Sequence, residues 1–135
     1  MRAFTCGGTI NPARFVKRST AADFTVLQAD ANSFPDGISQ NWGVDAPIPS
    51  VTADPGPAGL SGDKIMVHGA NTGSPQDTTV WLLLGGTVTR GSFLMPDANG
   101  AGITCTTTKY YGAIADESGV SGEWIKVTPV TGYMV

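Results

Sequence analysis

Residues 80–102 read VWLLLGGTVTRGSFLMPDANGAG, and this stretch decides the fold class. Short apolar runs alternate with glycine breaks and with an Asn99-Gly100 pair, a pattern typical of antiparallel β-structure. The run 80–84 is too short and too continuously apolar for an amphipathic helix, so it predicts a strand buried on both faces. We expect 81–84 to be the central strand of a barrel, with turns at 85–91 and 96–102 folding neighbouring strands onto it.

The composition of the whole chain favours the same class. The 135 residues include 18 glycines and 9 prolines, and only 14% are charged, against about 25% in typical domains. Thr and Val are frequent, whereas the helix formers Glu, Lys and Gln are scarce. We therefore predict a single all-β domain over 1–135, a small antiparallel β-barrel or sandwich with long Pro/Gly-rich loops.

Further short segments show the alternation or the turn boundaries of strands. They are 13–18, 24–29, 38–40, 63–68, 93–95, 103–106, 110–115 and 122–127. Short strands that are separated by such frequent turn signals favour a sandwich or a small barrel. The last residues, 129–135, read as a short tail with the apolar end Tyr133-Met134-Val135.

The longest irregular stretch is 41–62, which contains four prolines and four glycines. A loop of this length inside a small domain is usually functional or mobile. Trp42 and Ile48 lie in it. Large apolar side chains in such a loop either pack back onto the core or anchor a partner.

Charge is distributed unevenly along the chain. The net charge is −3, which argues against a general nucleic-acid binder. The segment 1–23 is nevertheless basic, because it holds four of the eight cations and its first acid is Asp23. These cations are Arg2, Arg14, Lys17 and Arg18. Two interpretations stay open: chance, or a basic arm that docks on an acidic partner.

The termini and the apolar runs indicate no association with a membrane. The first residues, MRAFTCGGTINPARF, lack the continuous apolar core of a signal peptide. No apolar run is long enough for a membrane-spanning helix.

Candidate catalytic and metal-binding residues are few. His68 is the only histidine, and with Cys6 and Cys105 it falls short of a zinc site. No serine lies in a G-x-S-x-G motif. Acidic residues cluster at Asp116, Glu117 and Glu123, where we expect them to be solvated. We predict two reduced, partly buried thiols, no metal, no cofactor and no enzymatic activity.

Several short motifs in a fixed order carry a resemblance to a known family. They are Pro12-Ala13-Arg14-Phe15-Val16-Lys17, Val26-Leu27-Gln28, Gly37-Ile38-Ser39, Gly62-Asp63-Lys64-Ile65-Met66-Val67, Gly85-Gly86-Thr87-Val88, Asp97-Ala98-Asn99-Gly100, Tyr111-Gly112-Ala113-Ile114-Ala115 and Gly122-Glu123-Trp124-Ile125-Lys126-Val127. In order and spacing the chain resembles the capsid decoration (cement) proteins of tailed bacteriophages, of the DUF2190-type group.

The resemblance implies a structural virion protein without catalytic residues. Such a protein sits on the outer surface of an HK97-type icosahedral capsid, binds the major capsid protein at capsomer junctions, and stabilises the shell. It implies a homo-oligomer, with a trimer favoured over a dimer. From the residues themselves we expect capsid or partner contacts at Arg14, Phe15, Lys17, Arg18, Trp42, Ile48, Tyr133 and Met134.

A carbohydrate- or receptor-binding β-module on a virion or cell surface is the alternative. Sugar-binding sites combine exposed aromatic side chains with nearby Asp, Asn or Arg. Trp42 with Asn41 and Asp45 is the cluster of this kind in the sequence.

Overall fold

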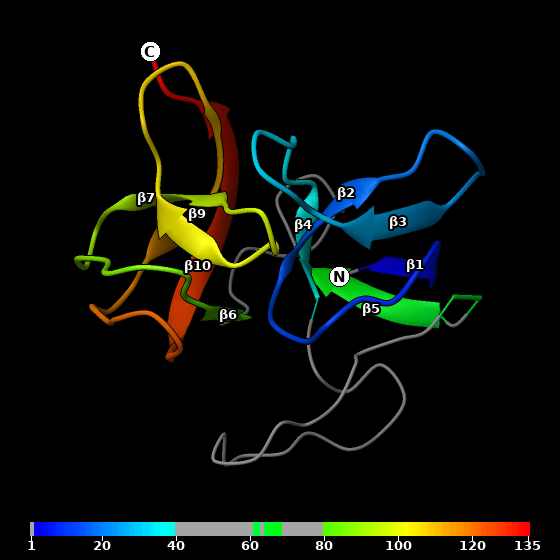
Figure 1. Ribbon diagram of the computed structural model, residues 1–135, viewed down its shortest axis with the longest axis horizontal. Coiled ribbons are helices and arrows are strands. Elements are labelled where there is room, and N and C mark those ends of the chain that lie inside the picture. Colours follow the sequence, from blue (N-terminus) through cyan, green and yellow to red (C-terminus); the bar gives the residue numbers. More distant parts are fainter. Residues whose placement is uncertain (1, 40–60, 63, 69–79) are drawn as a thin grey trace.

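The computed structural model describes residues 2–39, 61–62, 64–68 and 80–135, and all of its ten regular elements are β-strands (Figure 1). The prediction of an all-β chain is therefore confirmed. The strands are β1 (Arg2–Cys6), β2 (Phe15–Arg18), β3 (Thr25–Gln28), β4 (Gly37–Ser39), β5 (Lys64–His68), β6 (Val80–Leu83), β7 (Phe93–Pro96), β8 (Gly102–Thr104), β9 (Tyr110–Ala115) and β10 (Trp124–Tyr133).

The first sheet is a closed barrel with the strand order β1-β3-β2-β4-β5. Strand β1, which the sequence did not predict, closes it by pairing with β5 on one side and with β3 on the other. The β1–β3 pair is parallel, so the expectation of a wholly antiparallel sheet is wrong at this point. The barrel has its own core, formed by Phe4, Cys6, Ile10, Val16, Val26, Ile65 and Val67.

The second sheet is antiparallel and has the order β6-β10-β9-β7-β8. It curls so far that its two edges meet in a bridge between Leu84 and Gly102, where the Gly85 N–H donates to the Gly102 carbonyl at 2.9 Å. The prediction of a central strand at 81–84 is wrong, because β6 lies at an edge. Burial along β6 also alternates, with Val80 and Leu82 buried and Trp81 half-buried, since one face of the strand points away from the core.

The predicted tail 129–135 is mostly strand, because β10 continues to Tyr133. Among the described residues, β6 pairs with β10 from Trp124 to Val127, and β9 pairs with β10 as far as Tyr133. Pro129 lies within this ladder, opposite Ala113 of β9. The register shifts between Pro129 and Gly132, after which Tyr133 lies opposite Tyr110.

The two sheets share a core through alternate residues of β2. Val16 points into the barrel, whereas Phe15 belongs to the cluster of the second sheet, and both are fully buried. This shared cluster joins Phe15, Ala29 and Ile38 of the first half of the chain to Val80, Leu82, Leu84, Val88, Leu94, Ala113, Ala115, Ile125 and Val127. Both faces of β2 are therefore packed where it passes between the sheets.

The predicted Asn99-Gly100 turn is confirmed, and it contacts strand β2 of the barrel. The Gly100 N–H donates to the Asp97 carbonyl at 3.1 Å, which closes the turn, and Gly100 has φ of 77°. The Phe15 N–H then donates to the Gly100 carbonyl at 2.8 Å. A Cβ on Gly100 would lie 3.1 Å from the Phe15 carbonyl oxygen. Glycine at this position thus permits both the turn and its close approach to β2.

Gly112 on β9 provides a second close approach between the halves of the chain. A Cβ there would lie 2.7 Å from Cε1 of Phe15 and 2.7 Å from Cβ of Pro35. Pro35 belongs to the connection between β3 and β4. The missing side chain of Gly112 therefore lets this connection lie directly on β9.

We expect Gly112→Ala to lower the free energy of unfolding by about 1–3 kcal/mol, because the added methyl group overpacks a buried seam. Gly8→Ala is the matched control, since the nearest atom to its added Cβ is 3.9 Å away, and it should change stability by less than about 0.5 kcal/mol. Urea unfolding of both variants measures the difference. Equal stability of the two would contradict the close approach at Gly112.

Candidate contact surfaces

The cations of the segment 1–23 are not on an arm. Lys17 and Arg18 lie on β2 of the barrel, and each has an acidic partner within the chain. Lys17 Nζ lies 3.1 Å from Oδ2 of Asp30, and Arg18 Nε lies 3.4 Å from Oδ1 of Asp36. A hydrogen bond from Ser33 and the bond from Lys17 hold the pKa of Asp30 below its usual value. The predicted basic arm is therefore corrected to a strand whose described cations are locally balanced.

Two other predicted contact residues hold the fold together. Arg14 donates from Nη1 to the Asn99 carbonyl at 3.2 Å, so it helps to seat the turn 97–100 on the barrel. Phe15 is 0% exposed, which removes it from the set of surface contacts. Its position between Arg14 and Lys17 suggested a surface residue, but its ring belongs to the core cluster that the two sheets share. Trp42 and Ile48 lie outside the described residues.

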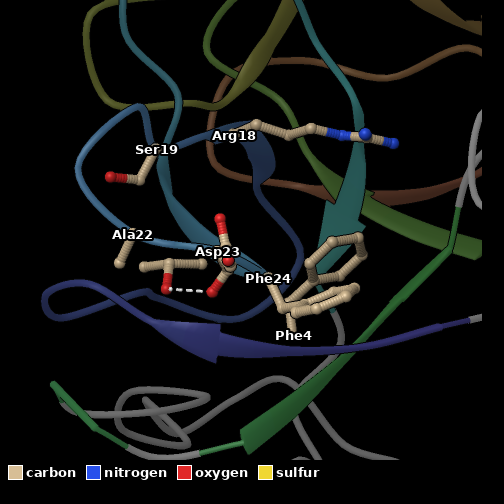
Figure 2. Close-up of a pocket in the computed structure, with 7 residues that line it drawn as sticks. Phe4, Arg18, Ser19, Ala22, Asp23 and Phe24 are labelled. Atoms are coloured by element: carbon tan, nitrogen blue, oxygen red, sulfur yellow. Dashed lines mark hydrogen bonds between the residues drawn. The ribbon is translucent and has the colours of Figure 1, made fainter.

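Arg18 also borders a hollow of about 340 Å³ beside β1 and β3. Figure 2 shows Ser19 and Ala22 on one side of it and the rings of Phe4 and Phe24 on the other. Phe24 is 64% exposed and has φ of 53°, an unusual conformation for a bulky residue. The Thr5 N–H donates to the Phe24 carbonyl at 2.7 Å, which fixes the backbone there. The hollow combines aromatic, hydroxyl and charged groups but contains no nucleophile paired with a base.

A second hollow, of about 410 Å³, lies at the seam between the sheets. Its polar lining includes Asn11, Gln28, Asp97 and Ser121. Asn11 donates to Oε1 of Gln28 from both its backbone and its side chain, and Gln28 donates to the Asn99 carbonyl. Oδ1 of Asp97 accepts two backbone N–H groups of its own turn. Gln28 therefore joins the sheets, while Asn11 orients Gln28 and Asp97 shapes the turn that Gln28 contacts.

An exposed row of aromatic side chains was not recognised from the sequence. Phe34, Tyr110 and Tyr133 are 41%, 43% and 48% exposed. The ring of Tyr110 lies 5.0 Å from that of Phe34 and 5.0 Å from that of Tyr133, and both pairs are edge-to-face. We call these three residues the aromatic row. Of the predicted contacts, Tyr133 belongs to it, and Met134 follows directly.

Strand pairing and the close approach at Gly112 assemble the aromatic row. Tyr110 and Tyr133 lie opposite each other on β9 and β10. The Met134 N–H donates to the Lys109 carbonyl at 2.8 Å, which fixes the end of β10. Phe34 immediately precedes Pro35, whose ring lies against Gly112. The apolar run 110–115 was a signal for the strand that carries Tyr110, but nothing local in the sequence pointed to Phe34.

Few of the described residues have the chemistry of a catalytic site. Over 2–39, 61–62, 64–68 and 80–135, no group of three His, Cys, Asp or Glu side chains could hold a metal ion. Cys6 and Cys105 are buried thiols, and burial raises the pKa of Cys105, which weakens it as a nucleophile. In the same part of the chain, no helix is long and apolar enough to span a membrane.

His68 ends β5 and is buried, with 7% of its surface exposed. Within the described part of the chain, neither ring nitrogen has a hydrogen-bond partner. Burial disfavours the charged imidazolium and so lowers the pKa of His68. His68 therefore lies at the end of a strand with its side chain packed against the protein rather than solvated.

Comparison with known proteins gives a likeness of fold. No family model matches the chain, and no curated protein matches its sequence. Among solved structures it is similar to the N base of the head fiber gp8.5 of bacteriophage phi29, with a TM-score of 0.65 and 13% sequence identity. The match covers 96% of this chain and 92% of that chain. The two chains therefore share a fold over nearly their whole lengths, and that neighbour is a component of a phage head. The DUF2190-type resemblance stays a prediction.

We expect the stability of the protein to fall as the pH drops below about 6.5, the ordinary pKa of histidine. The pKa of His68 is lower in the folded protein than in the unfolded chain, so the unfolded chain takes up the proton first. The contribution of neutral His68 to the free energy of unfolding is therefore fully present above the pKa of the unfolded chain. It falls as the pH drops from there to the pKa of the folded protein, by at most about 1.4 kcal/mol per pH unit.

His68→Leu should remove this dependence and leave stability at pH 8 unchanged or higher, because it deletes buried polar atoms that lack partners. Urea unfolding of both proteins at pH 8, 6.5 and 5 measures the effect. The same loss of stability at pH 5 in wild type and variant would refute the assignment to His68.

Proposed function

We propose that this chain is a structural protein of a tailed-bacteriophage virion. It binds the outer surface of an HK97-type capsid through the major capsid protein and stabilises the shell at capsomer junctions. The observation that carries the proposal is the fold shared, over 96% of this chain, with the N base of a phage head fiber. The order of motifs in the sequence supports the same class independently.

The physical character of the molecule suits such a role. Two sheets joined by a common core give a rigid body, and only 14% of the residues are charged. A shell repeats the same contact many times, so modest interfaces can reinforce one another by multivalency. A protein that works in this way needs buried area and a firm fold rather than a reactive group.

The proposed contacts with the major capsid protein combine exposed cations and an apolar end. Lys17 and Arg18 are 32% and 49% exposed. Surface ion pairs contribute only about 0–1 kcal/mol, so both cations can exchange their partners for acids on a capsid. Met134, together with Trp42 and Ile48, completes the proposed contact set.

Cryo-electron microscopy of the virion tests the location. We expect density for this chain outside the shell at capsomer junctions, arranged as trimers in preference to dimers. Removing the gene should give heads that lose their DNA at lower temperature, because the junctions lose their reinforcement. Density confined to the tail, or a particle that lacks the chain, would refute the proposal.

Charge reversal tests the cationic contacts. Lys17→Glu with Arg18→Glu should lower the occupancy of the chain on purified heads by about tenfold at low salt, because opposite charges across an interface become like charges. Arg90→Glu is the matched control, since Arg90 is an exposed cation of the second sheet's half of the chain. Gel densitometry of sedimented heads measures occupancy. Equal binding of all three proteins would remove Lys17 and Arg18 from the interface.

A further inference from the structure

We propose that the aromatic row is a binding platform for a short neutral saccharide. The row consists of Phe34, Tyr110 and Tyr133, which come from both halves of the chain and meet at the end of the second sheet nearest the C-terminus (Figure 1). This site differs from the Trp42 cluster that the sequence suggested, and it does not depend on the proposed location in a virion.

The rings of the row pair edge to face, and each side chain remains partly exposed. Tyr110 makes angles of 67° with Phe34 and 64° with Tyr133, so adjacent rings stand nearly perpendicular. An aromatic face carries partial negative charge and attracts the weakly positive C–H groups of an apolar ligand surface. Pyranose rings present such a C–H surface on one side and hydroxyl groups around the edge. The two phenol groups of the row can donate or accept hydrogen bonds at that edge.

The row is held in place before any ligand arrives. Tyr110 and Tyr133 form a direct cross-strand pair, and Pro35 anchors Phe34 against Gly112. Side-chain alternation turns Tyr111 to the opposite face of β9, where its ring packs 4.4 Å from that of Phe93. Rings that are already ordered lose little entropy on binding, which favours weak but specific recognition.

The size of the row distinguishes a small ligand from a protein partner. An aromatic side chain offers about 150–250 Å². At 41–48% exposure, the three together present about 200–330 Å². A stable protein interface buries about 800 Å² on each partner, so the row alone is too small for a second copy of the chain. It matches the stacking surface of a short sugar chain.

The charge of the molecule favours a neutral ligand. None of the three side chains is charged at neutral pH, and the chain as a whole carries −3. An anionic polysaccharide or a nucleic acid would therefore meet a repulsive long-range field. A neutral hexose or N-acetylhexosamine polymer would not.

Saturation-transfer NMR with the full chain tests the site. The probes are maltohexaose, cellohexaose, chitohexaose and a mannohexaose, each at about 10 mM, a concentration that detects millimolar affinity. We expect transfer to the ring C–H protons of at least one probe. Tyr110→Ala and Tyr133→Ala should each weaken binding by about tenfold, as the loss of a stacking side chain does elsewhere. Tyr133→Phe retains the ring and should bind within about threefold of wild type.

Phe24→Ala is the matched control, because it deletes a more exposed aromatic side chain that lies outside the row, in the hollow beside β1 and β3. It should leave binding unchanged, and thermal melts verify that every variant is folded. The proposal is overturned if none of the four probes binds, or if both alanine variants bind like wild type. It is also overturned if the alanine variants change only the oligomeric mass measured by light scattering, which would identify the row as a protein interface.

Discussion

The hydrogen bonds of the turn 97–100 to the barrel are the constraint on which the rest of the structure depends. The Gly100 carbonyl accepts from the Phe15 N–H, and the Asn99 carbonyl accepts from the side chains of Arg14 and Gln28. These bonds fix the second sheet against β2 at the point where Phe15 enters the shared core. The Leu83 N–H adds a further bond across the seam, to the Ala13 carbonyl at 2.8 Å. Such directional bonds are needed because apolar packing by itself sets no unique orientation between two curved sheets.

The location of most strands could be predicted from the sequence, whereas the order of the strands within each sheet could not. Alternation and turn residues located the strands from β2 to β10 because both signals lie within a few residues of the strand itself. The prediction that 81–84 forms a central strand was wrong, because the position of a strand within a sheet depends on which distant strands pair with it. Pro129 suggested the end of a strand, but β10 continues through it to Tyr133. Strand β1 was missed because its alternation is short and ends at Gly7-Gly8.

The contact surfaces illustrate the same division between local and distant information. The sequence grouped Lys17 with Arg18 correctly, but their balancing acids, Asp30 and Asp36, come from later in the chain. Phe34 and Tyr133 are separated by most of the protein, and only the approach of Pro35 to Gly112 brings them to one surface. Charge counts and hydropathy report what a segment contains. They do not report what the folded chain places opposite it.

The division of the sheets along the chain bears on how the protein is made. The barrel uses strands within 2–68 and the second sheet uses strands within 80–133. During vectorial synthesis the barrel strands leave the ribosome first, while Phe15, Ala29 and Ile38 still lack the second-sheet partners of their cluster. The nascent barrel thus emerges with an exposed apolar surface. The time needed to translate the second half of the chain decides how long that surface stays exposed. During that interval, neighbouring nascent chains are most prone to associate through this apolar surface.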